Sequence, residues 1–218
     1  MKTAILIGAT GLVGSHILNQ LLENRHYSKV IVFTRRTLNI QSKKLEEHCV
    51  DFNKMDAWKD LISGDDLFSA MGTTIKTAGS QEAQYLIDYT YPFRVAKFAK
   101  QNGIKSYALV SSGGANTKSN NFYSRMKGEL DRDVTELNFE KTIIVRPSII
   151  EGNRNESRVG ETIGLKIMHV LKHVPGLSKY KPAAAELIAS CMVKAMNDDF
   201  QKENCMFEWN RVMEYAQS

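Results

Sequence analysis

Apolar residues along the chain follow two patterns: short continuous runs, and longer stretches in which apolar positions recur every three or four residues. A continuous apolar run is typical of a strand buried on both faces, and the wider spacing is typical of an amphipathic helix. The predicted strands are Thr3–Gly8, Lys29–Thr34, Cys49–Phe52, Asp66–Met71, Ser106–Ser112, Lys141–Pro147 and Cys205–Trp209. The predicted helices are Leu12–Arg25, Gln81–Asn102, Phe122–Leu137, Ile163–His173 and Pro182–Met196.

The order of these elements predicts the fold class. Strands that alternate with helices favour an α/β fold, in which a parallel sheet is doubly wound and covered by helices on both faces. The 218 residues suit one domain, 1–218, and we find no linker that divides the chain. After Pro147 the sequence becomes polar and contains glycines. We therefore expect residues 148–218 to form a small C-terminal extension on the substrate side of the sheet.

Composition and charge narrow the class of protein. Hydrophobic residues make up 43% of the chain and charged residues 24%, as in an ordinary globular protein. The net charge of +5 is compatible with a phosphorylated cofactor, or with weak contact to nucleic acid or a membrane. The positive charges are scattered, and the densest cluster, Lys166–Lys181, has a helical spacing that favours a solvated basic face. We therefore expect a small-molecule substrate and no nucleic-acid partner.

The three cysteines, Cys49, Cys191 and Cys205, are far apart and form no CxxC pair. This usage favours reduced thiols, without a disulfide framework or a metal site, and it indicates a cytoplasmic protein. No segment is long and apolar enough to predict a membrane span. A monomer and a homodimer are both compatible with the sequence.

Three glycines mark the junction between the first strand and the first helix, in the stretch GATGLVG from Gly8 to Gly14. Glycine at such a junction is explained either by a tight turn with close packing or by the approach of a phosphate to a helix N-terminus. The position after a strand and at the start of a helix is the context of the dinucleotide-binding fingerprint. In that fingerprint Gly8 makes the turn, Gly11 admits the pyrophosphate and Gly14 lets the helix pack on the strand.

The end of the second strand bears on the choice of cofactor. Folds that bind NAD place an acidic residue about 20 residues after the glycines, where it binds the ribose 2′-hydroxyl. Here that place holds Thr34, Arg35 and Arg36, and a guanidinium suits a 2′-phosphate. The sequence favours NADP(H), with NAD(H) as the alternative if both arginines are only surface residues. Asp51 and Phe52, after the third strand, are further candidates for contact with the adenine.

The stretch SSGGANTKSNNFYSRMK carries the candidate catalytic side chains. Tyr123 and Lys127 lie one helical turn apart and share a helix face, so the lysine ammonium favours the phenolate that acid–base catalysis requires. Ser111 and Ser112 end the fifth strand, where a hydroxyl can orient a carbonyl oxygen beside the phenol. The alternative is a surface tyrosine beside a surface lysine. The position at the end of a parallel strand, where ligands bind, favours the catalytic interpretation.

Together, GATGLVG, SSGGAN and YSRMK resemble the short-chain dehydrogenase/reductase superfamily. The glycine spacing is similar to that of its extended and atypical branches. The stretches MGTT at 71–74, SSGGANTKSNNFYSRMKGEL at 111–130 and RPSIIEGNRNESRVGE at 146–161 are similar to the atypical group that includes the Tat-interacting protein. The resemblance spans nearly the whole chain, and it implies a Rossmann fold that binds NADP(H) and an oxidoreductase site.

The resemblance also implies a role for each site residue. Tyr123 would be the general acid–base, and Lys127 would bind the nicotinamide ribose and tune Tyr123. Ser112, or else Ser111, would orient the substrate carbonyl. The cofactor-binding residues that it implies are Gly8, Thr10, Gly11, Leu12, Val13, Gly14, Arg35, Arg36, Asp51, Phe52, Gly72, Thr73, Lys127 and Pro147.

The expected function is that of an NADP(H)-dependent reductase or dehydrogenase that acts on a small carbonyl or alcohol. The fourth strand ends in MGTT rather than Asn-Ala-Gly, so the resemblance supplies no helix-borne asparagine. Two alternatives stay open, a non-catalytic cofactor-sensing protein and a sugar-nucleotide epimerase or dehydratase. The intact Ser–Tyr–Lys set disfavours the first, and the short segment after Pro147 disfavours the second.

The polar stretch Glu151–Glu161 follows the sixth strand, so it should leave the sheet at the edge that holds the cofactor. Its glycines and arginines predict a lid in which Arg154 or Arg158 binds a carboxylate or phosphate of the substrate or cofactor. The alternative is an ordinary surface connection whose own glutamates neutralise the arginines.

Overall fold

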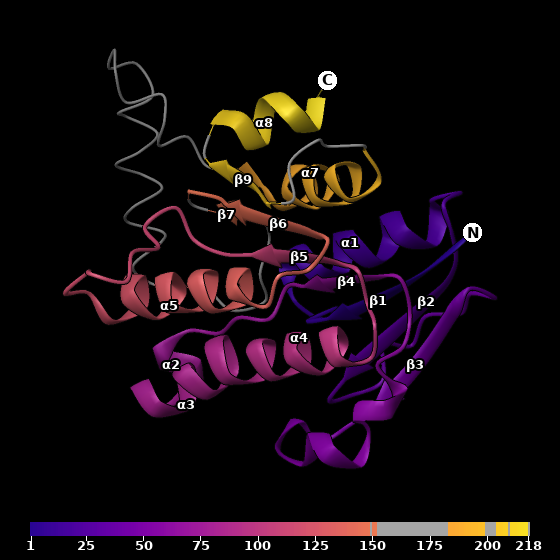
Figure 1. Ribbon diagram of the computed structural model, residues 1–218, viewed down its shortest axis with the longest axis horizontal. Helices are drawn as coiled ribbons and strands as arrows, with labels where there is room; N and C mark the ends of the chain where they lie inside the picture. Colours follow the sequence, from indigo (N-terminus) through magenta and orange to yellow (C-terminus); the bar gives the residue numbers. More distant parts are fainter. Residues whose placement is uncertain (149, 152–182, 199–203, 209, 218) are drawn as a thin grey trace.

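The computed structural model describes residues 1–148, 150–151, 183–198, 204–208 and 210–217. Its main feature is a seven-stranded sheet in the order β3-β2-β1-β4-β5-β6-β9, in which every neighbouring pair is parallel (Figure 1). The strands are β1 Lys2–Ile7, β2 Tyr27–Thr34, β3 Leu45–Cys49, β4 Asp66–Ser69, β5 Ser106–Val110, β6 Lys141–Arg146 and β9 Asn204–Glu208. Two short strands, β7 Ile150–Glu151 and β8 Ala183–Ala184, form a separate parallel pair.

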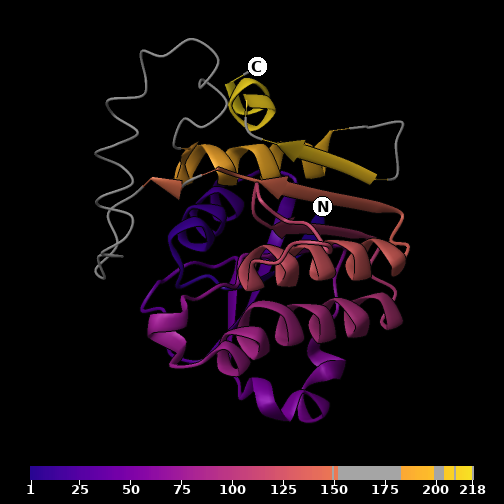
Figure 2. The ribbon, with the colours of Figure 1, turned by 90° about the vertical axis from the view of Figure 1, so that its left-hand side faces the viewer.

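Helices cover both faces of the sheet (Figure 2). One face carries α1 Leu12–Glu23 and α7 Ala185–Asn197, with α8 Asn210–Gln217 packed against α7 and β9. The other face carries α4 Tyr91–Gln101 and α5 Phe122–Glu136. The shorter elements are 3-10 turns at Phe52–Ala57 and Lys59–Leu61, α2 Ile75–Ala78, α3 Gln81–Tyr85 and a π-helical turn at Leu86–Thr90. The predicted doubly wound α/β fold is confirmed.

The core follows from the alternation of side chains along each strand. In β1, Ala4 and Leu6 face α1 and α7, whereas Ile5 and Ile7 face the α4 side. All four are fully buried, and complete burial of an aliphatic side chain contributes about 1.5–3 kcal/mol. Because both faces of this strand are buried, its sequence is a continuous apolar run. The helices α1 and α7 lie side by side, and Gln20 Nε2 donates to Ser190 Oγ at 2.9 Å.

The third strand lies at Leu45–Cys49 and not at the predicted Cys49–Phe52, so that prediction is wrong in its bounds. β3 is an edge strand of mostly half-exposed, polar residues, and its backbone pairs with β2. Charged side chains are common on edge strands, where they oppose association with other sheets. Phe52 instead begins a 3-10 helix, whose N-cap is Asp51.

The predicted single helix Gln81–Asn102 is divided into α3, the π-helical turn and α4. Pro92 lies in the first turn of α4 and has no N–H to donate to the carbonyl four residues earlier, that of Asp88. Proline and π-bulges are both recognised interruptions of a regular α-helix, and here they occur together. The prediction missed this break because the apolar spacing continues through it.

Other boundaries differ less from the predictions. The sixth strand, the helix from Phe122 and the C-terminal strand are present within a few residues of their predicted bounds. α8 was not predicted, and the predicted helix Ile163–His173 and the basic cluster Lys166–Lys181 lie outside the described residues. Among the helices of the described ranges, none is long and apolar enough to cross a membrane.

Candidate active site

The carboxyl ends of the strands meet at one edge of the sheet, because all seven strands run in the same direction. The predicted site residues within the described ranges lie in the segments that follow those ends, or in the first two turns of α1 and α5. The loops comprise residues 8–11 after β1, 35–36 after β2, 50–52 after β3, 70–74 after β4, 111–121 after β5 and 147–148 after β6. Arg154 and Arg158, with most of the predicted lid, lie outside the described residues.

The glycine turn after β1 is tightly packed. Gly8 has a φ of +85°, and a Cβ there would lie 2.5 Å from the carbonyl oxygen of Ala70. A Cβ on Gly14 would lie 2.0 Å from the carbonyl oxygen of Gly8. Close packing alone therefore explains why positions 8 and 14 are glycine. Gly11 differs, because it has an extended backbone with a φ of −82° and is exposed at the N-cap of α1.

The N-terminus of α1 has the properties of an anion site. Its N-cap, Gly11, has no side chain to bond the first N–H groups, and its first turn contains no acidic residue. The helix dipole and the backbone donors at such an end favour a negatively charged group. The residues in this position are Thr10, Gly11, Leu12 and Val13, of which Thr10 is exposed and Val13 is buried.

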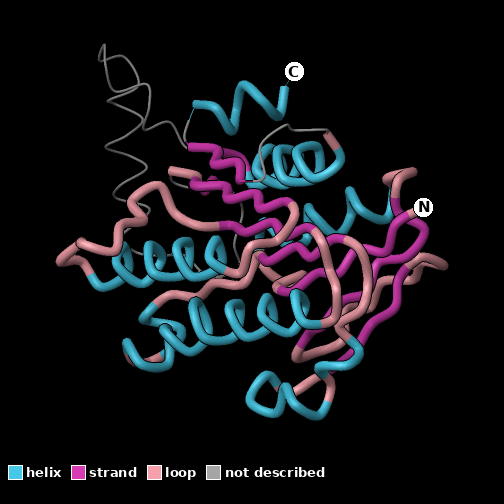
Figure 3. The backbone as a smooth tube through the Cα atoms, in the orientation of Figure 1, coloured by secondary structure: helices cyan, strands magenta, loops and turns pink. Residues whose placement is uncertain are grey.

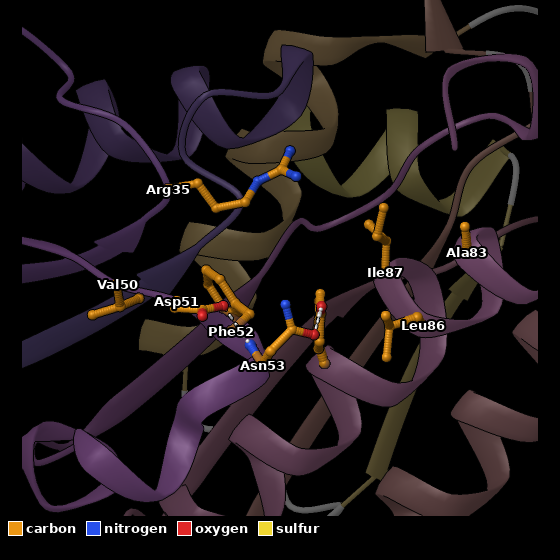
Figure 4. A pocket seen from close by; sticks show the side chains of 9 residues that line it. Arg35, Val50, Asp51, Phe52, Asn53, Ala83, Leu86 and Ile87 are labelled. Atoms are coloured by element: carbon orange, nitrogen blue, oxygen red, sulfur yellow. Dashed lines mark hydrogen bonds between the residues drawn. The ribbon is translucent and has the colours of Figure 1, made fainter. Parts of the chain in front are cut away.

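A pocket of about 370 Å³ lies at the same edge of the sheet, between the loops after β2 and β3 and the start of α4 (Figure 4). Arg35, Asp51 and Phe52, three of the residues predicted to bind the cofactor, line one side. The opposite side is lined by Ala83, Leu86, Ile87 and Tyr91. An apolar wall with a cation at the rim fits a flat heterocycle that carries a phosphate nearby.

Polar groups inside the pocket are held by one another. The Tyr91 hydroxyl donates to Asn53 Oδ1 at 2.6 Å, and the Asn53 backbone N–H donates to Asp51 Oδ1 at 2.9 Å. Burial raises the pKa of the Tyr91 phenol, which stays a donor at neutral pH. Phe52 is only 3% exposed and contacts Trp58, so it forms the floor of the pocket. Sequence reasoning missed Asn53 and Tyr91, because neither belongs to a motif.

Arg36 is the second predicted phosphate ligand, and it is exposed. Its backbone is fixed by Thr34, whose hydroxyl donates to the Arg36 carbonyl at 2.9 Å. Two consecutive arginines therefore follow the end of β2, and Arg35 lines the pocket (Figure 4).

One face of α5 carries a row of polar side chains, Tyr123, Lys127 and Asp131, spaced one turn apart. Lys127 is 2% exposed, and its ammonium lies 6.0 Å from the centre of the Tyr123 ring. Burial lowers the pKa of Lys127, but Asp88, Tyr123 and Asp131 outweigh it and raise that pKa above its ordinary value. The structure thus brings the predicted tyrosine and lysine together and keeps the lysine charged.

Asp88 is the partner of Lys127 and was not predicted. It lies in the π-helical turn and is 1% exposed. Its Oδ2 is 3.6 Å from Lys127 Nζ, and its Oδ1 accepts the Thr73 N–H at 2.6 Å. Gln84 Nε2 also donates to the Thr73 carbonyl at 3.2 Å, and a Cβ on Gly72 would lie 3.6 Å from Asp88 Oδ2. The loop after β4 is therefore fixed against the lysine.

Asp131 and Arg146 extend the polar row toward the edge of the sheet. Arg146 Nε donates to Asp131 Oδ2 at 2.8 Å, and its NH1 donates to Glu208 at 2.9 Å. Burial raises the pKa of Asp131, and Ser111 and Arg146 oppose that rise. The Ser111 hydroxyl is buried and faces Asp131, outside hydrogen-bond length. Ser111 is thereby directed toward the interior beneath α5.

The loop after β5 positions the start of α5 (Figure 3). Gly113 N donates to the Pro147 carbonyl at 2.8 Å, which joins the loops after β5 and β6. Asn121 caps α5 by accepting the Ser124 N–H at 3.0 Å. A Cβ on Gly128 would lie 2.4 Å from Thr117 N, so only glycine lets α5 approach this loop. Ser112 is half-buried at the start of the loop.

Comparison with known proteins gives the family. The model of a family described as NAD(P)H-binding matches residues 8–198. Fungal proteins named as the mitochondrial protein fmp52 are similar in sequence. That of Aspergillus fumigatus is 39% identical over 203 residues, which cover 89% of this chain and 87% of that protein. That of Meyerozyma guilliermondii is 36% identical over 195 residues, which cover 87% and 83%.

Solved structures show the same fold at low sequence identity. MoeE5 in complex with UDP-glucose and NAD has a TM-score of 0.70 and 16% identity, and covers 99% of this chain and 81% of its own. ADP-L-glycero-D-manno-heptose-6-epimerase from Helicobacter pylori has a TM-score of 0.69 and 21% identity, with the same coverage.

The names of the fungal relatives contradict the predicted cytoplasmic location and point to mitochondria. The prediction rested on reduced cysteines, and reduced thiols do not distinguish one reducing compartment from another. That premise is compatible with the structure, in which none of Cys49, Cys191 and Cys205 forms a disulfide. From the matched family and the parallel seven-stranded sheet, we conclude that this chain belongs to the NAD(P)H-binding family and has the Rossmann-type fold of the short-chain dehydrogenases/reductases.

Proposed function

We propose that the protein is an NADP(H)-dependent oxidoreductase that acts on a small carbonyl or alcohol. The observation that carries the proposal is the buried, charged Lys127 beside Tyr123, on the helix that follows the carboxyl end of β5. A buried ammonium is retained only where it is paired, and breaking such a pair costs roughly 3–5 kcal/mol. A tyrosine next to such a charge is suited to proton transfer.

The residues present fit a dinucleotide phosphate. The open N-terminus of α1 at Gly11 would hold the pyrophosphate, and the pocket beside Asp51 would hold the adenine. The guanidinium groups of Arg35 and Arg36 would bind a 2′-phosphate. The backbones of Gly72, Thr73 and Pro147 would line the nicotinamide side.

The proposed chemistry divides between cofactor and protein. When bound, NADPH supplies the hydride that reduces the carbonyl carbon. Tyr123 would donate the proton to the carbonyl oxygen, so that aldehyde or ketone becomes alcohol. Lys127 would bind the nicotinamide ribose and promote that proton transfer. We assign orientation of the carbonyl to Ser112, because Ser111 faces Asp131; Ser111 is the second candidate.

The rest of the chain would complete the site. We propose that residues 148–218 contribute to the substrate side, with Arg154 or Arg158 binding an anionic group, whereas α7, β9 and α8 of that range belong to the sheet and the helices that cover it. We also propose a mitochondrial location, on the names of the fungal relatives. The proposed reaction does not depend on either of these two proposals.

The test uses the purified chain. NADPH and NADH binding is followed by cofactor fluorescence, and turnover is followed by NADPH absorbance with a panel of aldehydes and ketones. UDP-sugars form a separate arm, read by product analysis. Tyr123→Phe should lower turnover by about 10²–10⁴-fold and keep cofactor binding. The matched control is Tyr27→Phe, a tyrosine at the amino end of β2, away from the site.

The results separate the possible functions. Reduction of an aldehyde that depends on Tyr123 supports the proposal. Binding of NADPH without turnover in either arm contradicts it and supports a cofactor sensor. Epimerisation of a UDP-sugar contradicts it in favour of the sugar-nucleotide function. Failure to bind either cofactor contradicts both NADP(H)-based functions.

A further inference from the structure

The buried carboxylate of Asp88 touches two parts of the site at once. Its Oδ2 lies 3.6 Å from Lys127 Nζ, and its Oδ1 accepts the backbone N–H of Thr73 at 2.6 Å. Lys127 belongs to α5, whereas Thr73 belongs to the loop after β4. Asp88 belongs to neither, and it is the link between them.

We propose that Asp88 is a positioning residue that fixes the Lys127 ammonium against the loop Met71–Thr73, where the cofactor ribose would lie. This inference rests on the proposed function, because it deepens the role of Lys127 at the same site. Asp88 acts through Lys127 and Thr73, and needs no contact of its own with substrate or cofactor.

Burial explains why an acid is needed at this place. The side chains of Lys127 and Asp88 are 3% and 1% exposed, so water does not solvate either charge. An isolated ammonium at that depth would lose its proton or leave the interior. The other titratable groups that face Lys127 are Tyr123 and Asp131, both on α5. Asp131 is already paired with Arg146 of β6, which leaves Asp88 as the nearest compensating charge.

The local backbone explains how an acid came to point inward. In the π-helical turn Leu86–Thr90 the backbone hydrogen bond joins residues five apart, from the Tyr91 N–H to the Leu86 carbonyl. Side chains on the two sides of this turn therefore point in different directions from those of one continuous α-helix. Pro92 favours that turn because it cannot donate to the Asp88 carbonyl. Asp88 is buried, while the neighbouring Leu86 is 38% exposed. The irregular turn therefore brings a carboxylate to the interior of the site.

The two carboxylate oxygens of Asp88 have separate roles: Oδ1 accepts a hydrogen bond, and Oδ2 forms an ion pair. Oδ1 fixes the loop by accepting the Thr73 N–H, and Gln84 Nε2 donates to the carbonyl of the same residue at 3.2 Å. Oδ2 fixes the lysine. Asparagine at this position would keep an acceptor for Thr73 but remove the charge that compensates Lys127. Asp88→Asn therefore separates the electrostatic role from the structural one.

The experiment measures NADPH affinity of Asp88→Asn and of the parent protein at several pH values. In the variant, burial acts on Lys127 without its nearest counter-charge, so the ammonium loses its proton at lower pH. We expect the ratio of variant Kd to parent Kd to rise about tenfold between about pH 7.5 and about pH 9.5. Introducing Lys127→Met into the variant should abolish that pH dependence.

The matched control is Asp133→Asn. Like Asp88, Asp133 is a hydrogen-bonded carboxylate, and it accepts the Tyr89 hydroxyl at 2.5 Å. It lies on α5 and pairs with Arg132, not with Lys127. Its Kd ratio should stay constant with pH. A constant ratio for Asp88→Asn as well would overturn the proposal, because a purely structural defect weakens binding equally at every pH.

A second measurement uses the parent protein, so it tests the inference even if Asp88→Asn does not fold. In the parent protein labelled with 15N-lysine, the Lys127 ammonium is identified by its loss in Lys127→Met. We expect it to stay protonated beyond pH 10.5, the ordinary lysine value, and to shift when NADPH is added. A Lys127 that titrates below that value would overturn the inference. Failure of the parent to bind NADPH would instead contradict the proposed function, while the titration still tests the pairing with Asp88.

Discussion

Replacing Gly8 with alanine would place a methyl group where the turn after β1 meets the loop after β4. The new Cβ would lie 2.5 Å from the carbonyl oxygen of Ala70 and 2.6 Å from the nitrogen of Met71. Both are backbone atoms in the middle of the site and cannot rotate away. The backbone of Gly8 also has a φ of +85°, which strains any residue with a side chain.

The expected cost has two parts. A side chain in the left-handed region costs roughly 1–2 kcal/mol. Overpacking against fixed neighbours costs about 1–3 kcal/mol more. Gly8→Ala should therefore lower the free energy of unfolding by about 2–5 kcal/mol, out of the roughly 5–15 kcal/mol available to a typical protein.

Gly103→Ala is the matched control. Gly103 has a φ of +86°, nearly that of Gly8, but a Cβ there would meet no atom within 4 Å. It should show the backbone cost alone, roughly 1–2 kcal/mol. Urea unfolding followed by circular dichroism measures both variants. Equal losses in the two would refute the inference that Gly8 is required by the contact with Ala70.

Gly11→Ala gives the complementary result. Gly11 has a φ of −82°, and the nearest atom to its Cβ would be the Gly8 carbonyl oxygen at 3.2 Å. Alanine at an N-cap costs at most about 1 kcal/mol relative to glycine. We expect a nearly stable protein whose NADPH affinity is reduced, because the methyl group lies where the pyrophosphate would approach. Unchanged affinity would favour a turn that serves packing only.

Three further predictions concern cofactor, catalysis and pH. Arg35→Ala with Arg36→Ala should remove most of an NADPH-over-NADH preference of roughly 1.5–3 kcal/mol, and equal affinities for the two cofactors in the parent would contradict it. Tyr123→Phe should lower turnover by about 10²–10⁴-fold with cofactor binding kept, and full activity would require another acid. Burial and Asp66 raise the pKa of Tyr27 above 10.0, so stability should fall above that pH as the unfolded phenol ionises, and less so in Tyr27→Phe.

The sequence predicts those parts of the fold that are governed by burial on both faces. β1 and β6 read as apolar runs because helices cover them on each side. β3 was misplaced because it lies at the edge, where half-exposed residues give no apolar run. Local spacing also predicted the pairing of Tyr123 with Lys127, since residues four apart on a helix are neighbours.

The buried polar contacts of the site could not be predicted from apolar runs and local spacing. Asp88 sits between Ile87 and Tyr89 in a stretch whose apolar spacing indicates a regular helix, and an acid there reads as part of the solvated face. Its burial depends on the π-helical turn and on Lys127, which is 39 residues later in the chain. Pro92 was the one local signal of irregularity. The partners Asp131 and Arg146 also come from different elements, so no short motif contains them.

The packing of α1 against α7 has a consequence for how the protein is made. The apolar face of α1, with Ile17 and Leu21, belongs to the same core as Ile188 and Met192 of α7. At roughly 5–20 residues per second, synthesis of the intervening chain takes on the order of 10–30 s, during which the part of that face that α7 covers stays without its partner. A chaperone, or an unfolded state maintained until the chain is released, must protect it. A fragment that ends before α7 should therefore aggregate rather than bind cofactor.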